Sequence, residues 1–132
     1  MTYVIDTHAL LWFLDGNQRL GMNAKTILSD PNASLVLPAI AYAEACWICE
    51  TGRKVSLPLS KLVSHVNRDP RITITPVNRS VVERSNSLVS INEMHDRQIV
   101  ATVLLIKDAG TDASLLSIDQ NIVDSGLVPM VW

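Results

Sequence analysis

Short runs rich in β-branched residues alternate with longer segments of helical spacing along this sequence, and this alternation constrains the fold most strongly. Buried strands are predicted at 2–6, 33–38, 71–76 and 113–119, and "VPMVW" at 128–132 reads as a short edge strand. Strands that alternate with helices form an α/β domain in which the sheet is mainly parallel. The sequence therefore predicts an α/β fold with a mainly parallel sheet of about five strands.

The segments between these strands carry apolar residues at helical spacing. Gly16 and Gly52 follow two of them, as is typical where a helix ends. We expect helices at 7–16, 20–30, 39–52, 57–69, 79–90 and 95–108. The sequence contains no internal repeat and no linker rich in Pro, Gly or Ser, so we expect residues 1–132 to form a single domain.

The composition is that of a folded globular protein, with 48% hydrophobic and 18% charged residues. The longest apolar run, "IVATVLLI", is too short to cross a membrane, and the N-terminal segment lacks the basic residues of a signal peptide. We therefore expect a cytoplasmic protein without a membrane partner. The net charge of −2 provides no overall basic field for nucleic acid, so a nucleic-acid partner requires local support.

Four acidic residues lie at strand ends or on apolar helix faces, where an unpaired charge is costly. Asp6 ends the first predicted strand and Asp119 the fourth, and sites in parallel sheets gather beyond the carboxyl ends of the strands. Glu44 and Asp96 each stand in line with the apolar residues of a predicted helix. Like charges brought together oppose folding unless a cation lies among them, and all-oxygen sites suit Mg²⁺ or Mn²⁺. The four acids therefore predict a metal site of the kind that nucleases use.

Each acid also has a purely structural interpretation. Asp6 could cap the helix that follows it, although Thr7 could serve as the cap and leave Asp6 free. Glu44 could pair with a buried arginine. Asp96 could be an acid at a helix start, where the helix dipole favours negative charge. Its neighbour Arg97 could touch substrate or pair with a nearby acid, and the salt bridge is the expected role.

The choice of the fourth acid is open from the residues alone. Asp119 could be an ordinary turn aspartate, because aspartate is common in turns. Asp112 and Asp124 lie nearby in the sequence and compete with Asp119 for the same role. The position of Asp119 directly after a predicted strand favours it as the site residue.

Two other patterns suggest different chemistry and are set aside. Cys46 and Cys49 form a CxxC, but they lie inside a predicted helix rather than at its start, and two cysteines cannot make a four-cysteine zinc site. A HAD-type phosphatase has a second aspartate two residues after the first, where this sequence has His8. His65 and His95 complete the histidines, and the three have no metal-ligand spacing.

Taken together, these motifs resemble the PIN-domain nucleases, in particular the VapC-type toxins of prokaryotic toxin–antitoxin pairs. The resemblance runs from the first strand to the closing "VPMVW". Each predicted acid lies in a segment similar to one of the family's acidic motifs, and these segments are "YVIDTHALLWFL", "AYAEACWICETGR", "HDRQIVATVLL" and "LLSIDQNIVDSG".

The resemblance implies a three-layer α/β/α sandwich, endoribonuclease activity with Mg²⁺ or Mn²⁺, a homodimer and a small inhibitory antitoxin. It implies that Asp6, Glu44, Asp96 and Asp119 bind the metal, some of them through water, with Thr7 and Ser117 in support. Two positions depart from the family's pattern, which often has Ser or Thr where this chain has Ala41, and Thr where it has Ser117. The alternative is a PIN-like domain that binds RNA or protein without cutting.

Overall fold

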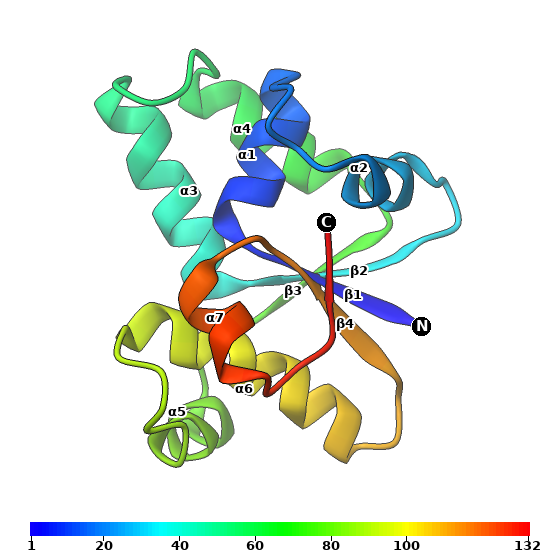
Figure 1. The fold of residues 1–132 in the computed structure, drawn as a ribbon. Coiled ribbons are helices and arrows are strands. Elements are labelled where there is room, and N and C mark those ends of the chain that lie inside the picture. Colours follow the sequence, from blue (N-terminus) through cyan, green and yellow to red (C-terminus); the bar gives the residue numbers. More distant parts are fainter.

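The computed structural model describes residues 1–132 and contains a five-stranded parallel sheet between two layers of helices (Figure 1). The strands lie in the order β3-β2-β1-β4-β5, and every neighbouring pair is parallel. The predicted α/β/α sandwich with a mainly parallel sheet is therefore confirmed. The strands are β1 (Thr2–Ile5), β2 (Ser34–Pro38), β3 (Ile72–Thr75), β4 (Ala113–Leu116) and β5 (Met130–Val131).

Seven helices cover the sheet, with α1 to α4 on one face and α5 and α6 on the other (Figure 1). All six predicted helices are present, and a seventh, α7, was not predicted because six residues are too few for a periodic pattern. The helices are α1 (Thr7–Asp15), α2 (Met22–Ser29), α3 (Ala39–Thr51), α4 (Leu59–Arg68), α5 (Arg79–Asn86), α6 (Met94–Asp108) and α7 (Gln120–Ser125).

The strand order reverses between β1 and β4. The chain forms β1, β2 and β3 in one direction across the sheet and then returns to place β4 on the other side of β1. Ile5 lies opposite Leu116 in the register of these two strands, and the Asp6 amide donates to the Leu116 carbonyl at 3.2 Å. The residues that follow β1 and β4 are thus brought together at the carboxyl edge of the sheet, where such folds leave a crevice.

The core lies on both faces of the central strands. Val4, Ile5, Leu115 and Leu116 are fully buried, so the chain turns from apolar to polar only at the end of each strand. Burial on both faces explains why these strands read as continuous apolar runs. None of the helices is both long enough and apolar enough to cross a membrane.

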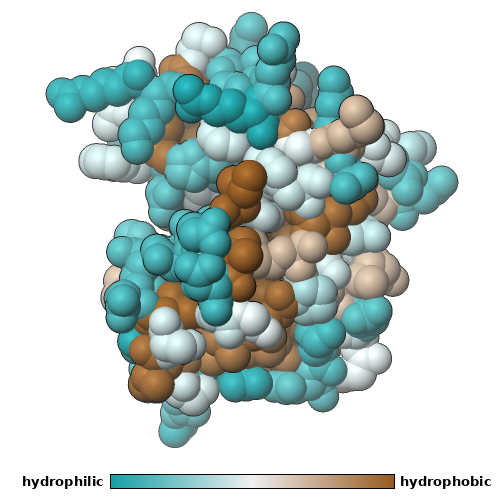
Figure 2. All heavy atoms as spheres, in the orientation of Figure 1, coloured by the Kyte–Doolittle hydropathy of each residue, from teal (hydrophilic) through white to brown (hydrophobic).

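Hydrophobic residues also reach the surface around α7. Ile118, Val123 and Leu127 are exposed, and Figure 2 shows hydrophobic side chains on the face of the molecule that carries this helix. Isolated exposed apolar residues are ordinary in folded proteins. Helix α7 has one buried residue, Ile122, so the apolar residues around it stay exposed.

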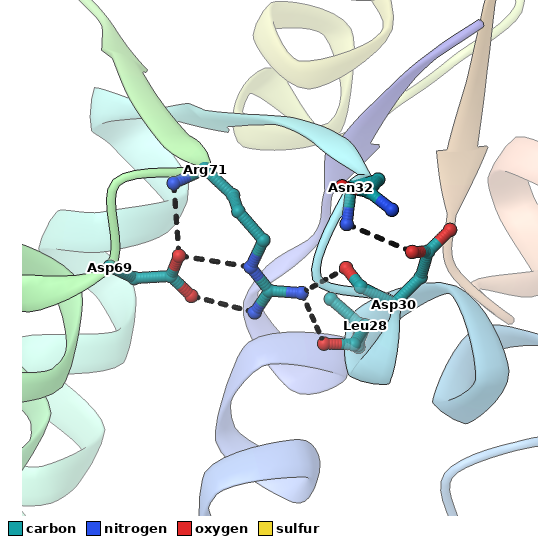
Figure 3. A network of polar contacts seen from close by, with 5 residues as sticks. All are labelled: Leu28, Asp30, Asn32, Asp69 and Arg71. Carbon is teal, nitrogen blue, oxygen red and sulfur yellow. Dashed lines mark hydrogen bonds and ion pairs between the residues drawn. The ribbon is translucent and has the colours of Figure 1, made fainter.

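Arg71, which is largely buried, links the start of the edge strand β3 to the end of α2 (Figure 3). Arg71 donates two hydrogen bonds to the Asp69 carboxylate, at 3.0 Å from Nε and 2.7 Å from Nη2. Its Nη1 donates to the backbone carbonyls of Leu28 and Asp30 at 2.8 and 2.7 Å. These carbonyls lie at the end of α2, where helix carbonyls lack partners within the helix, so Arg71 satisfies them.

Candidate functional site

Asp6 is buried at the end of β1 and is held by two hydrogen bonds. Its Oδ1 accepts from the Thr7 amide at 2.7 Å, and its Oδ2 accepts from the Ser117 hydroxyl at 2.6 Å. Asp6 is therefore the cap of α1, the first of the two possibilities that the sequence left open, and Thr7 is not. Thr7 instead begins the helix, and its hydroxyl donates to the backbone carbonyl of Ala41 at 3.4 Å.

Asp119 lies at the same edge of the sheet, two residues beyond Ser117. Its carboxylate caps α7 by accepting from the amides of Asn121 and Ile122, at 2.9 and 3.4 Å. Its own amide donates to the Ser117 hydroxyl oxygen at 3.0 Å. Ser117 thus contacts both acids and sets their separation across the gap between β1 and β4.

The two competing aspartates are placed differently. Asp112 precedes β4 at the opposite edge of the sheet and pairs with Lys107 at 3.5 Å. Asp124 is exposed on α7 and accepts a hydrogen bond from Gln120 at 2.6 Å. The charge of Asp119, in contrast, raises the pKa of both Asp6 and Asp96, in each case after the effect of burial. The geometry therefore places Asp119 with the other acids.

Glu44 lies on α3 and is only partly buried, with its side chain 31% exposed. No arginine pairs with it, so the predicted alternative of a buried arginine pair is absent. Its nearest basic group is His95, whose Nδ1 lies 3.7 Å from the Glu44 carboxylate. Trp47, expected on the same apolar stripe, is 65% exposed, so Glu44 stands at the border between the buried and exposed faces of α3.

Asp96 lies in the first turn of α6, but Glu93 rather than Asp96 caps that helix. Burial and the negative charges of Asp119, Asp6, Glu93 and Glu44, in that order, raise the pKa of Asp96 to about 7. All three other predicted acids therefore act on this one carboxyl group. Burial makes the largest contribution to this rise and the neighbouring negative charges add to it, and a cation bound among the acids would relieve their repulsion.

The same crowding affects Asp6. Burial raises its pKa above the usual range, the hydrogen bonds from Ser117 and Thr7 oppose the rise, and the charge of Asp119 adds to it. No lysine or arginine forms an ion pair with any of the four predicted acids. The nearest basic groups are two histidines: the charge of His8 lowers the pKa of Asp6, and His95 lies 3.7 Å from Glu44. The site is otherwise a group of negative oxygen donors.

The chemistry of these donors fits a hard divalent cation, because four carboxylates supply only oxygen ligands. As the side chains are placed, no three His, Cys, Asp or Glu groups lie close enough together to hold an ion. Asp6 and Asp119 are held in place by hydrogen bonds, whereas Glu44 and Asp96 sit partly exposed on separate helices. For all four acids to contact one cation, the side chains of Glu44 and Asp96 would have to move.

Sequence reasoning missed two neighbours of the site and misassigned a third. His95 lies 3.4 Å from Glu93 as well as close to Glu44, a contact between α3 and α6 that no local pattern could indicate. Glu93 caps α6 although glutamate is not among the residues preferred at that position, so local rules did not indicate it. Arg97 forms no salt bridge, contrary to expectation, and instead donates to the Ile91 carbonyl, holding the loop before α6.

Comparisons with known proteins bear on the fold and the family of the chain. The structure is similar to one in the crystal structure of VapBC2 from Rickettsia felis bound to a DNA fragment from their promoter, with a TM-score of 0.72 over 99% of this chain and 98% of that chain. At 15% identity this likeness shows the shared fold. A comparison with curated proteins found no match. The PIN-domain family model matches residues 3–122, and the chain therefore belongs to the PIN-domain family.

Proposed function

We propose that this protein is a metal-dependent endoribonuclease. The observation that carries the proposal is the pKa of Asp96, which burial and then the charges of Asp119, Asp6, Glu93 and Glu44 raise to about 7. Asp6, Asp96 and Asp119 also stand at helix starts, but a helix start alone does not require acids to lie close enough to raise one another's pKa. Membership of the PIN-domain family, whose VapC-type members are nucleases, supports the same conclusion.

Asp6, Asp96, Asp119 and Glu44 would hold the ion, some of them through water. Bound there, Mg²⁺ or Mn²⁺ would activate a water molecule and offset the negative charge that develops on the phosphodiester. Asp6 is the most firmly positioned of the four, because Ser117 and Thr7 fix both of its oxygens. These two hydrogen bonds also favour its ionised form, the form that can act as a ligand.

His95 is placed to influence the exposed side of the site. Its Nδ1 lies within 3.7 Å of Glu44 and 3.4 Å of Glu93, so the imidazole can hold both carboxylates in one orientation when it is protonated. It lies on α6 directly before Asp96. His95 is therefore a positioning residue for Glu44, whose carboxylate, like that of Asp96, accepts no hydrogen bond.

Cleavage of RNA is the direct test. Purified protein should cut structured and single-stranded RNAs with Mg²⁺ or Mn²⁺, and EDTA should stop it. Asp96→Asn should abolish the cut, whereas Asp124→Asn, a matched change at an exposed aspartate outside the site, should retain it. Cleavage that persists in EDTA, or in the Asp96→Asn protein, would contradict the mechanism.

We further propose that the protein is the toxin of a type II toxin–antitoxin pair. The resemblance of its motifs to VapC-type toxins supports this role, and the similar solved structure is that of VapBC2 with promoter DNA. A small antitoxin should then bind the acidic groove, and the toxin should act as a cytoplasmic homodimer. Expression of the active protein alone should arrest host growth, and co-expression of the neighbouring reading frame should restore it. Free growth with active protein would remove the toxin role.

The alternative is a PIN-like domain that binds RNA or a protein without cutting. Both hypotheses predict binding, so only the chemistry separates them. RNA that is bound but stays intact with Mg²⁺ and with Mn²⁺ would favour the binding domain. The mutual repulsion of these acids, none of which pairs with a lysine or arginine, favours catalysis, because binding RNA requires no such charge.

A further inference from the structure

A small hollow opens directly beside two of the acids. Its volume is about 190 Å³, and one side of it is formed by Asp6, Ser117 and Asp119. The rest of its lining is largely aromatic and includes His8, Trp12 and Trp132. The hollow therefore joins the proposed site of cleavage to a group of flat rings, contributed by α1 and the segment after β5.

The rings in this hollow are inclined to one another rather than stacked. His8 and Trp12 have centroids 5.5 Å apart at 60°, and Trp12 and Trp132 have centroids 5.8 Å apart at 69°. In an edge-on pair one ring uses its edge, so its own faces stay uncovered by the partner. His8, Trp12 and Trp132 are all only partly buried, which leaves aromatic surface available to a ligand.

Gly21 fixes the position of Trp132. A Cβ atom at residue 21 would lie 2.3 Å from the Trp132 carbonyl carbon and 2.5 Å from its Cδ1, closer than such atoms can approach. The absence of a side chain therefore lets Trp132 pack onto the backbone just before α2. The indole is held against α1 and α2 by this contact and by Trp12.

A second hollow, of about 660 Å³, lies on the other side of Trp12 and is basic. Trp12 lines both hollows, and Arg19 and Lys25 line the second. The Arg19 guanidinium lies 5.8 Å from the centroid of the Trp12 ring. Arg19 lies over the Trp12 ring, and neither Arg19 nor Lys25 forms an ion pair with an acid, so no acid neutralises either charge.

We infer that single-stranded RNA binds along this surface, which we call the track. One base stacks on Trp12 and Trp132 beside the acids. The phosphate backbone continues to Arg19 and Lys25. Aromatic rings that stack bases, next to cations that follow the backbone, are how proteins hold single strands. In a duplex the bases are already stacked on one another and cannot enter such a hollow. The inference rests on the proposed function, since it names how the same site receives its substrate.

Binding without cleavage tests the track. A labelled pool of short single-stranded oligoribonucleotides of random sequence is titrated in EDTA, where the proposed cleavage cannot proceed. Trp132→Leu, which keeps an apolar group against Gly21, and Trp12→Leu should each weaken binding about tenfold. Trp47→Leu is the matched control, because Trp47 is exposed on α3 and lines neither hollow. Equal affinity in all proteins, or no binding by the wild type, would overturn the inference.

A second measurement avoids any change to the track. The chain has three tryptophans, so a Trp47→Phe protein emits only from Trp12 and Trp132. Stacking of a base on either ring should quench that emission as RNA is added, and an oligonucleotide of abasic sugars should not. Quenching that is the same with abasic RNA, or absent when binding is seen, would show that no base reaches the rings.

These results are separable from the proposed catalysis. Loss of binding in the Trp12 and Trp132 variants, together with wild-type RNA that stays uncut in Mg²⁺, would support the track and refute the nuclease. Metal-dependent cleavage with undiminished binding in both tryptophan variants would support the nuclease and refute the track. Arg19→Gln should reduce the salt dependence of binding while leaving the quenching by bound RNA in place.

Discussion

The Ser117 hydroxyl donates a 2.6 Å hydrogen bond to the Asp6 carboxylate, across the gap between the ends of β4 and β1. Both side chains are buried. The bond joins residues far apart in sequence at the point where the strand order reverses, and it counters the rise that burial causes in the pKa of Asp6. Ser117 therefore keeps a buried carboxyl group closer to its ionised form.

Removing this hydroxyl should destabilise the protein. Ser117→Ala leaves Asp6 with one hydrogen bond fewer in a buried place, which should cost about 1.5–3 kcal/mol in the free energy of unfolding at neutral pH. Urea unfolding of the purified variant measures the loss. Ser117→Thr is the matched control, because it keeps the hydroxyl and should stay near wild type. Equal losses for both variants would mean that packing, and not the hydrogen bond, holds Asp6.

Replacing Asp96 with Asn should have the opposite effect on the metal-free protein. The change keeps the shape but removes a charge that Asp119, Asp6 and Glu44 repel, so stability should be unchanged or rise by about 1 kcal/mol after solvent screening. The thermal shift on adding Mn²⁺ should shrink, because one ligand is lost.

Melting curves with and without Mn²⁺ decide this prediction. Asp124→Asn is the control, since that aspartate is exposed and should show the full metal shift. If Asp96 were only an acid favoured at a helix start, Asn would be neutral to destabilising and the metal shift would stay the same. That result would remove Asp96 from the site.

The strands and the convergence of the acids were predictable, because each depends on short stretches of sequence and one general rule. The runs that end at Asp6 and near Asp119 are largely apolar, and the carboxyl ends of parallel strands meet at one edge. Helix α7 was missed because Ile122 is its only buried residue, which gives no periodic pattern. Asp119 was predicted as a site acid from its place after a strand, but its additional role as the cap of this short helix was not predicted.

Contacts between distant side chains were not predictable from one sequence. Trp12 and Trp132 face each other only because α1 and the segment after β5 meet beyond the sheet, and His95 approaches Glu44 only because α6 lies beside α3. Thr7 shows a milder case, where the residue was expected to matter but for a different role. Local rules placed it at a helix start, and only the fold directs its hydroxyl to Ala41.

Asp69 should make the free energy of unfolding depend on pH. Hydrogen bonds from Arg71 lower the pKa of Asp69 below its ordinary value of 3.8, so the folded protein binds its proton less readily than the unfolded chain. The stability from this pair is therefore present above about pH 4 and is lost as the pH falls through the lower, folded pKa. Asp69→Asn should cost about 1–2 kcal/mol at pH 7 and progressively less below pH 4. A cost that does not change with pH would contradict the ion pair.

Cys46 and Cys49 should be dispensable for activity. They lie inside α3 rather than at its start, both are free thiols, and burial raises the pKa of each, which keeps them protonated and unreactive. Replacing both with Ala should leave metal-dependent cleavage largely intact at a packing cost of about 1 kcal/mol each. Activity that follows the concentration of reductant in the wild type, or vanishes in a folded double variant, would restore a redox role.

Gly21→Ala should displace Trp132 through steric contact alone. The backbone of Gly21 has φ of −63°, which any residue can adopt, so the added methyl group causes no conformational strain. It would lie 2.3 Å from the Trp132 carbonyl carbon, and the cost of relieving that overlap should be about 1–3 kcal/mol. The near-ultraviolet circular dichroism of the Trp12–Trp132 pair should weaken at the same time.

Gly52→Ala is the control, because it replaces a glycine without touching Trp132. Gly52 has φ of +64° and no atom near the position of a Cβ, so Ala there is strained but touches nothing. It should cost about 1 kcal/mol and leave the tryptophan signal unchanged. RNA binding should fall in the Gly21→Ala protein and persist in the Gly52→Ala protein, because only the first moves Trp132 away from the acids. If both variants lose stability but keep the same tryptophan signal and the same affinity, Gly21 is not what holds Trp132 in place.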